Sequence, residues 1–225
     1  MLYEALFSIL IVTVLTGLLS IGRRSSRYFP KTSLSDGHFY NSYYAGIREE
    51  VIKQTGFSPK DVDYLFRRFG SLDRCHKRYL DTMDFHGING LCHNVLGEQV
   101  IEMFLHTDTG HCDFMRFCKV IATFRKSRNP EEKKELIKKK IALIYEMFDV
   151  NSDGQITRDD IVILLRHMMG NKVCISTIKS IAQRMIYEGN TRKGNKDTSD
   201  FTSMNIEQFT SLLDKEYVYT HMSIK

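Results

Sequence analysis

Residues 149–160, with the sequence DVNSDGQITRDD, place oxygen-bearing side chains at the spacing of a calcium-binding loop. A twelve-residue EF-hand loop takes its ligands from positions 1, 3, 5, 7, 9 and 12, and it needs Gly at position 6 for a sharp turn. Counting from residue 149 places Gly154 at position 6. Because the ligand positions supply hard oxygen atoms, we expect the loop to bind one Ca²⁺ ion. These positions carry Asp149, Asn151, Asp153, Gln155, Thr157 and Asp160.

Position 12 of this loop departs from the usual pattern. Asp160 stands where a Glu normally supplies two oxygen atoms, and its side chain is one methylene shorter. Coordination through one oxygen favours a smaller, octahedral shell, so we expect Mg²⁺ to compete and Ca²⁺ to bind more weakly than in a loop that ends in Glu. The alternative is a loop that has lost its metal and only supports its neighbour. Three carboxylates and the glycine turn argue against that alternative.

Helix, loop and helix recur at three other places, where the loops have lost essential ligands. In the loop at residues 73–84, side chains of the wrong chemistry replace ligands and the glycine. They are Cys75, Lys77 and Arg78. The next loop ends in Arg116 instead of a carboxylate, and the last is several residues too long and ends in the neutral amide Gln208. A single intact metal loop therefore argues against a calcium buffer, which would need several.

Four helix–loop–helix units predict an all-α protein of two EF-hand pairs, because one unit cannot bury its own apolar face. In the first unit, Ser58 and Pro59 indicate a helix start. The apolar residues that follow at helical spacing are Val62, Leu65, Phe66 and Phe69. In the intact loop, Ile156 is expected to pair as a strand residue with Met204.

The predicted organisation follows the chain in five segments. They are a hydrophobic N-terminal segment at 1–22, a linker at 23–46, a lobe with metal-free loops at 47–124, a basic connector at 125–140, and a lobe with the intact loop at 141–225. The connector is interpreted as a solvated face, with contact to a membrane surface as the alternative.

The N-terminal segment has the composition of a membrane anchor. Residues 5–22 carry no charge, and their length is at the short end for a bilayer span. Glu4 precedes the run and Arg23 and Arg24 follow it, which predicts that the body after the segment lies in the cytosol. A cleaved signal peptide would have a basic start and a shorter apolar core. A buried helix or an artefact of the gene model would also produce such a run, and the sequence does not indicate which membrane is involved.

Residues 161–170, IVILLRHMMG, are apolar on more than one helical face. Such a helix is buried on both sides or receives a partner. We expect it to contribute to a groove for an amphipathic target helix, with methionines as the adaptable surface, and core packing alone is the alternative. The predicted groove residues are Ile161, Leu164, Leu165, Met168, Met169, Met185, Leu212 and Leu213.

Other chemistry is not supported by the residue patterns. His106, His111 and Cys112 lie close together, but their spacing matches no standard zinc site. The sequence contains no catalytic triad, phosphate-binding glycine loop or HExxH motif, so we expect no enzyme activity. Five scattered cysteines fit a reducing cytosol. The formal charge of +5 suits an acidic partner such as an anionic membrane, and we predict no nucleic-acid partner.

Several stretches resemble calcineurin B homologous proteins, relatives of the calcineurin regulatory B subunit, over residues 47–225. They are TGFSPKDVDYLFRRFGSLD, HNVLGEQVIEMF, FMRFCKVIATFR and the closing HMSIK. The resemblance implies two metal-free N-terminal loops and two calcium-binding C-terminal loops, and this chain departs from it in the last loop and at Asp160. The family also begins with Met-Gly for myristoylation, whereas this chain begins Met1-Leu2. The apolar N-terminus is expected to replace that lipid.

The resemblance implies an accessory subunit that binds an amphipathic helix of its target. The favoured target is a cytosolic helix of a membrane transporter such as a sodium/proton exchanger. The alternative is a regulatory B subunit of a calcineurin-like phosphatase. With a single weak site that tolerates Mg²⁺, we expect the metal to act as a structural clamp and not as a switch.

Overall fold

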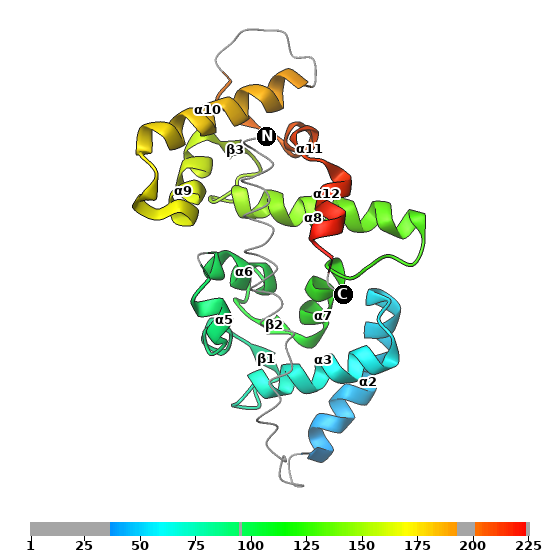
Figure 1. The fold of residues 1–225 in the computed structure, drawn as a ribbon. Helices are drawn as coiled ribbons and strands as arrows, with labels where there is room; N and C mark the ends of the chain where they lie inside the picture. Colours follow the sequence, from blue (N-terminus) through cyan, green and yellow to red (C-terminus); the bar gives the residue numbers. More distant parts are fainter. Residues whose placement is uncertain (1–36, 95, 193–200, 224–225) are drawn as a thin grey trace. The chain divides into compact units, whose positions relative to one another are not determined.

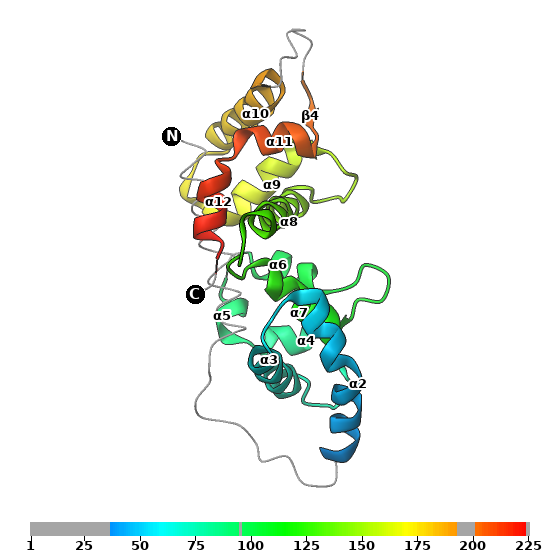
Figure 2. The same cartoon turned by 90° about the vertical axis from the view of Figure 1, so that its right-hand side faces the viewer.

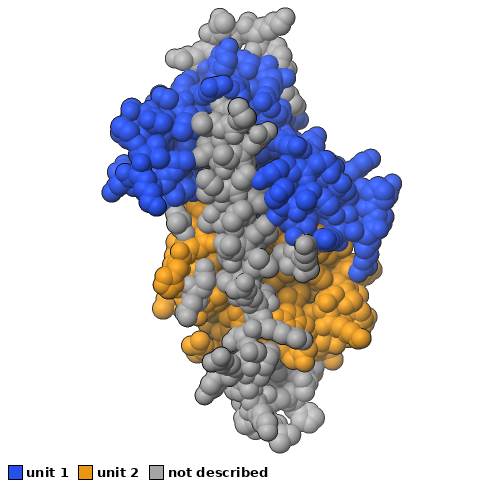
Figure 3. Space-filling model, viewed as in Figure 1, with its two compact units in different colours: residues 1–15, 126–225 blue, residues 16–125 orange. Residues whose placement is uncertain are grey.

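The structure, a computed structural model, describes residues 37–94, 96–192 and 201–223 (Figure 1). The described residues divide into two compact units, one ending at Arg125 and the other beginning at Lys126 (Figure 3). This boundary lies inside the predicted basic connector at 125–140. Most of the connector belongs to a helix of the second unit, which begins at Pro130.

The N-terminal unit consists of helices of different lengths and one pair of strands. In order these are α2 (Gly37–Thr55), α3 (Pro59–Leu72), β1 (Tyr79–Leu80), α4 (Thr82–His86), α5 (Asn89–Cys92), α6 (Gly97–Phe104), β2 (Cys112–Asp113) and α7 (Phe114–Thr123). Helix α3 begins as predicted, because Ser58 and Asp61 form a reciprocal cap and Pro59 occupies the first turn. Its apolar residues, Val62, Leu65, Phe66 and Phe69, are buried as expected.

Helix α2 corrects the predicted linker, which extended to residue 46. The chain is helical from Gly37 because aromatic and charged side chains attach it to α3. The ring of Tyr44 stacks on Phe66 with centroids 4.0 Å apart. Arg48 Nε donates to Asp63 Oδ1 at 2.9 Å, and the Tyr44 hydroxyl donates to the same carboxylate. The segment was not predicted to be helical because aromatic and charged side chains make these contacts. It lacks the aliphatic residues at helical spacing that would have indicated a helix.

The C-terminal unit has the same order of helix, strand and helix. Its elements are α8 (Pro130–Phe148), β3 (Ile156–Thr157), α9 (Arg158–Met169), the 3₁₀ turn η1 (Gly170–Lys172), α10 (Ile175–Arg192), β4 (Ser203–Met204), α11 (Ile206–Leu212) and α12 (Lys215–His221). Helix α9 packs against α10, α10 against α11, and α12 against α8 (Figure 2).

Each unit joins its two loops through one antiparallel strand pair. In the N-terminal unit Leu80 lies opposite Cys112. In the C-terminal unit Ile156 lies opposite Met204, which confirms the predicted pairing. All four of these side chains are fully buried, so each loop pair is tied to the core of its unit.

The basic connector is not uniformly solvated. Lys140 in α8 is fully buried, its Nζ lies 3.0 Å from Ser223 Oγ, and it sits 4.7 Å from the centroid of the Tyr219 ring. Lys133, two helical turns earlier, forms an ion pair with Glu216 at 2.7 Å. Two of the connector lysines therefore hold α12 against α8, which corrects the interpretation of the whole run as solvent-facing.

Within the parts of the chain described here, no helix is both long and apolar enough to cross a membrane. The predicted anchor at 1–22 lies outside the described residues.

Candidate metal site and target surface

The third loop, residues 149–160, has the backbone of a metal-binding loop around Asp149. The Asp149 side chain is almost completely buried, and its two oxygen atoms accept the N–H groups of Asp153 at 3.1 Å and Gly154 at 2.8 Å. Gly154 has φ 82°, a left-handed conformation that glycine adopts without a steric penalty. The turn at Gly154 thus holds Asp149, the first predicted ligand, in place.

The exposed ligand positions hydrogen-bond one another. Asn151 Nδ2 donates to Asp153 Oδ2 at 2.9 Å, and the Gln155 N–H donates to Asp153 Oδ1 at 2.8 Å. The Gln155 side chain instead accepts from Ser203 Oγ at 3.4 Å, across the strand pair. A position 7 residue coordinates through its backbone carbonyl, so this side-chain contact leaves its ligand atom unaffected.

Asp160, the position that departs from the usual pattern, caps helix α9. Its Oδ2 accepts the Thr157 N–H at 2.9 Å and the Thr157 hydroxyl at 2.6 Å, while the Asp160 N–H donates back to that hydroxyl at 3.3 Å. This is the reciprocal cap of a helix start. One of the two Asp160 carboxylate oxygens is therefore already used by the cap.

The described residues contain no group of three or more His, Cys, Asp and Glu side chains close enough to hold a metal ion. The third loop nevertheless fits Ca²⁺ or Mg²⁺ by chemistry, because it combines hard oxygen ligands with the required glycine turn. The predicted ligands would have to draw together around an ion. Their assignment remains a prediction.

The fourth loop, residues 190–208, is closed by two amides. Gln208 Nε2 donates to Asn190 Oδ1 at 2.7 Å, and Asn190 Nδ2 donates to the carbonyls of Ile186 at 2.9 Å and Ser203 at 3.0 Å. Asn190 is buried, so these hydrogen bonds replace its contacts with water. The role of Asn190 was not recognised from the sequence; its signal was an Asn and a Gln at the two ends of one loop.

Tyr145 of α8 connects the third and fourth loops and was also missed from the sequence. Its hydroxyl lies 2.7 Å from the carbonyl oxygen of Gly154 and 3.3 Å from that of Met204. Burial raises the pKa of this hydroxyl, and the carboxylates of Asp149 and Asp153 raise it further. Tyr145, with its hydroxyl protonated, therefore links the third loop, which is the candidate metal site, to the fourth loop.

The second loop, residues 105–116, has a cation at position 12. Arg116 Nη2 donates to the carbonyl oxygens of Met103 at 3.0 Å and Leu105 at 3.5 Å, at the end of α6. The residues considered for zinc have structural roles: the His111 ring stacks on Tyr79 at 4.0 Å, and Cys112 is fully buried. Burial also raises the pKa of the Cys112 thiol, which disfavours the thiolate that zinc requires.

Comparison with known proteins identifies the family. The chain is 30% identical over 154 residues to the type 2 calcineurin B subunit of Dictyostelium discoideum, which covers 68% of this chain and 80% of that protein. The chain belongs to the calcineurin B-like family of EF-hand proteins. Its described helices are consistent with that fold, and the resemblance seen in the sequence is confirmed at the level of this family.

Two further relatives cover more of the calcineurin B-like chain at lower identity. The calcineurin B subunit of Yarrowia lipolytica is 25% identical over 176 residues, covering 78% of this chain and 94% of that protein. The calcineurin B subunit of Naegleria gruberi is 24% identical over 177 residues, covering 79% and 92%. No protein-family model matches the chain. The family consists of calcium-binding, non-catalytic regulatory subunits, so the prediction that this chain is not an enzyme is confirmed.

The predicted target groove of this calcineurin B-like protein is largely interior in the structure. Ile161, Leu164, Leu165, Met185, Leu212 and Leu213 are buried. Met168 and Met169, near the end of α9, are partly exposed. The reason is that α10 packs against both α9 and α11, so apolar residues on several faces have neighbours. An incoming helix would require the buried side chains to become accessible, and the groove stays a prediction.

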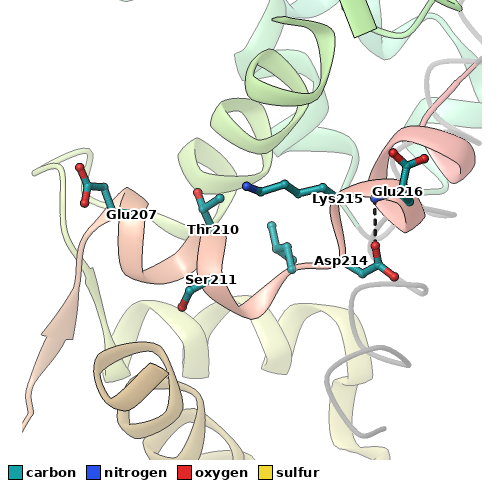
Figure 4. A pocket seen from close by; sticks show the side chains of 7 residues that line it. Glu207, Thr210, Ser211, Asp214, Lys215 and Glu216 are labelled. Carbon is teal, nitrogen blue, oxygen red and sulfur yellow. Dashed lines mark hydrogen bonds between the residues drawn. The ribbon is translucent and has the colours of Figure 1, made fainter. Parts of the chain in front are cut away.

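A shallow pocket lies at the turn between α11 and α12, with a volume of about 620 Å³ (Figure 4). Its lining consists of Glu207, Thr210, Ser211, Leu213, Asp214, Lys215 and Glu216. Asp214 accepts the Glu216 N–H at 2.9 Å and so starts α12. Six of these seven residues are polar or charged, and Leu213 is the only predicted groove residue among them.

Proposed function

We propose that this calcineurin B-like protein is the regulatory subunit of a calcineurin-like phosphatase and binds a helix of the catalytic chain. The observation that carries the proposal is the set of calcineurin B subunits among its relatives, of which this chain covers 80% to 94%. A regulatory subunit needs a partner chain, and an EF-hand lobe typically receives an amphipathic helix. The exchanger favoured from the sequence has less support, because these relatives all carry the name of calcineurin.

The metal part of the proposal is one Ca²⁺ site in the third loop. Asp149, Asn151, Asp153, the Gln155 carbonyl, Thr157 and Asp160 would hold the ion. The first and second loops each contain a cationic side chain at a ligand position, and the fourth is closed by neutral amides. A bound ion would supply positive charge that joins the loop's carboxylates to the start of α9. Because Asp160 already caps α9, the ion would reinforce an existing helix start, which supports a clamp.

Location is the third part of the proposal. The uncharged run at residues 5–22 and the basic residues after it support a membrane anchor, with the two EF-hand units in the cytosol. An anchored regulatory subunit would concentrate its partner at a membrane surface.

The test is the affinity of the full-length protein for two labelled helical peptides, one from a calcineurin-type catalytic chain and one from the juxtamembrane region of a sodium/proton exchanger. Fluorescence anisotropy would be measured with Ca²⁺, with Mg²⁺ alone and with chelator. We expect the phosphatase peptide to bind in all three conditions, several-fold more weakly in chelator. Preference for the exchanger peptide would favour the transporter as the target, and binding only with Ca²⁺ would indicate a sensor.

The surface is tested with paired variants on α9. Met168→Asp with Met169→Asp changes the partly exposed predicted groove residues without placing a charge in the core, and it should abolish peptide binding. Arg166→Asp with His167→Asp changes two exposed residues of the same helix and is the matched control, which should bind normally. Normal binding by the methionine variant would show that the target surface lies elsewhere.

A further inference from the structure

The first loop, residues 73–84, follows the backbone path of the third loop although its ligands have been lost. At position 4, His76 has φ 55° and Ser152 of the third loop has φ 57°. At position 6, Arg78 has φ 70° and Gly154 has φ 82°. Residues with side chains disfavour this left-handed conformation, so some interaction has to maintain it in His76 and Arg78.

Position 1 of the first loop makes the same contacts as in the third. Asp73 is fully buried, and its two oxygen atoms accept the N–H groups of Lys77 at 2.8 Å and Arg78 at 2.7 Å. Asp149 accepts the N–H groups of the corresponding positions 5 and 6 in the third loop. The hydrogen bonds that shape a calcium loop are thus retained in a loop whose side chains could not coordinate calcium.

The ammonium group of Lys77 occupies the ligand-facing side of this loop. Lys77 is at position 5, and its Nζ lies 2.6 Å from Asp81 Oδ2 and 2.8 Å from Asp84 Oδ2, at positions 9 and 12. The Asp84 side chain is only 11% exposed, so an uncompensated charge there would be costly. Both aspartates also form the reciprocal cap of α4. One ammonium therefore joins the last two ligand positions and the start of the exit helix.

We propose that the Lys77 ammonium takes the place of a metal ion in the first loop. It holds Asp81 and Asp84, and with them the start of α4, in position without any metal. A divalent ion in an EF-hand links the loop to the exit helix through positions 9 and 12. Lys77 makes that link from within the chain. Calcium then acts on the C-terminal unit alone. This inference concerns the N-terminal unit and does not depend on which target the protein binds.

Electrostatics and the partner loop agree with this role. Hydrogen bonds with Asp81 and Asp84 raise the pKa of Lys77, and the one with Lys77 lowers the pKa of Asp81, so the pair is charged across the physiological range. The second loop, joined to the first through β1 and β2, contains the Arg116 guanidinium on the carbonyls at the end of α6. Both loops of the unit are thus closed by side-chain cations.

Hydrogen–deuterium exchange of the full-length protein tests the proposal, because it reads the first and third loops separately. In chelator, the wild-type amides of Lys77 and Arg78 should be protected, and calcium should not change them. In Lys77→Met, their exchange should be faster by about tenfold or more. The third loop, residues 149–160, should respond to calcium equally in both proteins. Lys119→Met removes an exposed lysine of the same unit and is the matched control, which should exchange like the wild type.

A second variant separates cation replacement from loss of folding. Lys77→Arg keeps a cation at position 5 beside Asp81 and Asp84, so most of the protection that is lost in Lys77→Met should be retained in chelator. Wild-type protection that requires calcium would overturn the proposal, as would unchanged protection in Lys77→Met. Loss of protection in Lys77→Arg as large as in Lys77→Met would also overturn it, because a cation at position 5 would then not be what holds the loop.

Discussion

At the scale of the residue, the side chain at position 12 differs in chemistry and in bonding partner among the four loops. Position 12 carries a carboxylate bonded to Lys77 in the first loop, an arginine in the second and an amide bonded to Asn190 in the fourth. In the third loop it carries Asp160, whose carboxylate is hydrogen-bonded to Thr157 of the same loop. Among the four loops, the third is therefore the one that we expect a bound metal ion to stabilise most.

Asp160→Glu should tighten Ca²⁺ binding on the order of tenfold, because the longer side chain can supply two oxygen atoms. Glu also suits the third position of a helix start, so the cap on Thr157 should be retained. Titration calorimetry should show one site, strengthened in this variant and lost in Asp149→Ala. Asp159→Glu, at the exposed neighbouring position, is the control and should bind like the wild type. A second strong site would contradict the interpretation of the fourth loop.

At the scale of the element, α2 depends on a small group of polar and aromatic contacts with α3. Arg48 and Tyr44 both bond the Asp63 carboxylate, and Tyr44 also stacks on Phe66. The hydrogen bonds from Arg48 and Tyr44 lower the pKa of Asp63. The charges of Arg48 and Arg67 lower it further. The helix is therefore attached partly through a group that can be titrated.

Acid should weaken the attachment of α2. The folded-state pKa of Asp63 is depressed, so its contribution to the free energy of unfolding is complete above its unfolded value of about 3.9 and is lost as pH falls through the lower folded value. Because the Asp63 side chain is 43% exposed, solvent screening keeps the effect small. Urea unfolding between pH 2 and 6 should show a steeper decrease below pH 4 for the wild type than for Asp63→Asn. Identical slopes would contradict the assignment.

At the scale of the whole molecule, the two units differ in the side-chain interactions that hold their loops together. The N-terminal unit has a cationic side chain in each of its loops, and the C-terminal unit has one loop rich in acidic side chains beside one loop whose ends are joined by amides. Tyr145 joins that acidic loop to its neighbour. A metal-dependent change is therefore expected to stay within the C-terminal unit, where the predicted target surface also lies.

The proposed anchor is tested on the intact chain. After carbonate extraction of membranes, the full-length protein should remain in the pellet, because an apolar span is not released by high pH or salt. A shortened chain that begins at Arg27 should become largely soluble. The shortened protein should keep its circular dichroism spectrum, which controls for loss of folding. Release of the full-length protein by carbonate would refute the anchor.

Local patterns in the sequence determined several features correctly. The start of α3 at Ser58 and Pro59 and the burial of its apolar face follow from spacing over a few residues. The pairing of Ile156 with Met204 follows from the recurrence of the helix–loop–helix unit, which puts one apolar residue in each of the two loops. The loss of a normal ligand set in the first loop was also readable, because side-chain charge at a loop position is a local property. Membership of the calcineurin B-like family followed from similarly short stretches.

Only the tertiary structure decided the features that depend on distant parts of the chain. The helical state of α2 rests on contacts with α3, and the closure of the fourth loop joins Asn190 to Gln208. The burial of the predicted groove residues depends on how α9, α10 and α11 pack, which apolar periodicity alone does not specify. The sequence placed a lysine in the first loop, but its bonds to both Asp81 and Asp84 depend on the folded geometry. The physical reason is that charge and spacing are local, whereas burial and hydrogen-bond partners are set by packing.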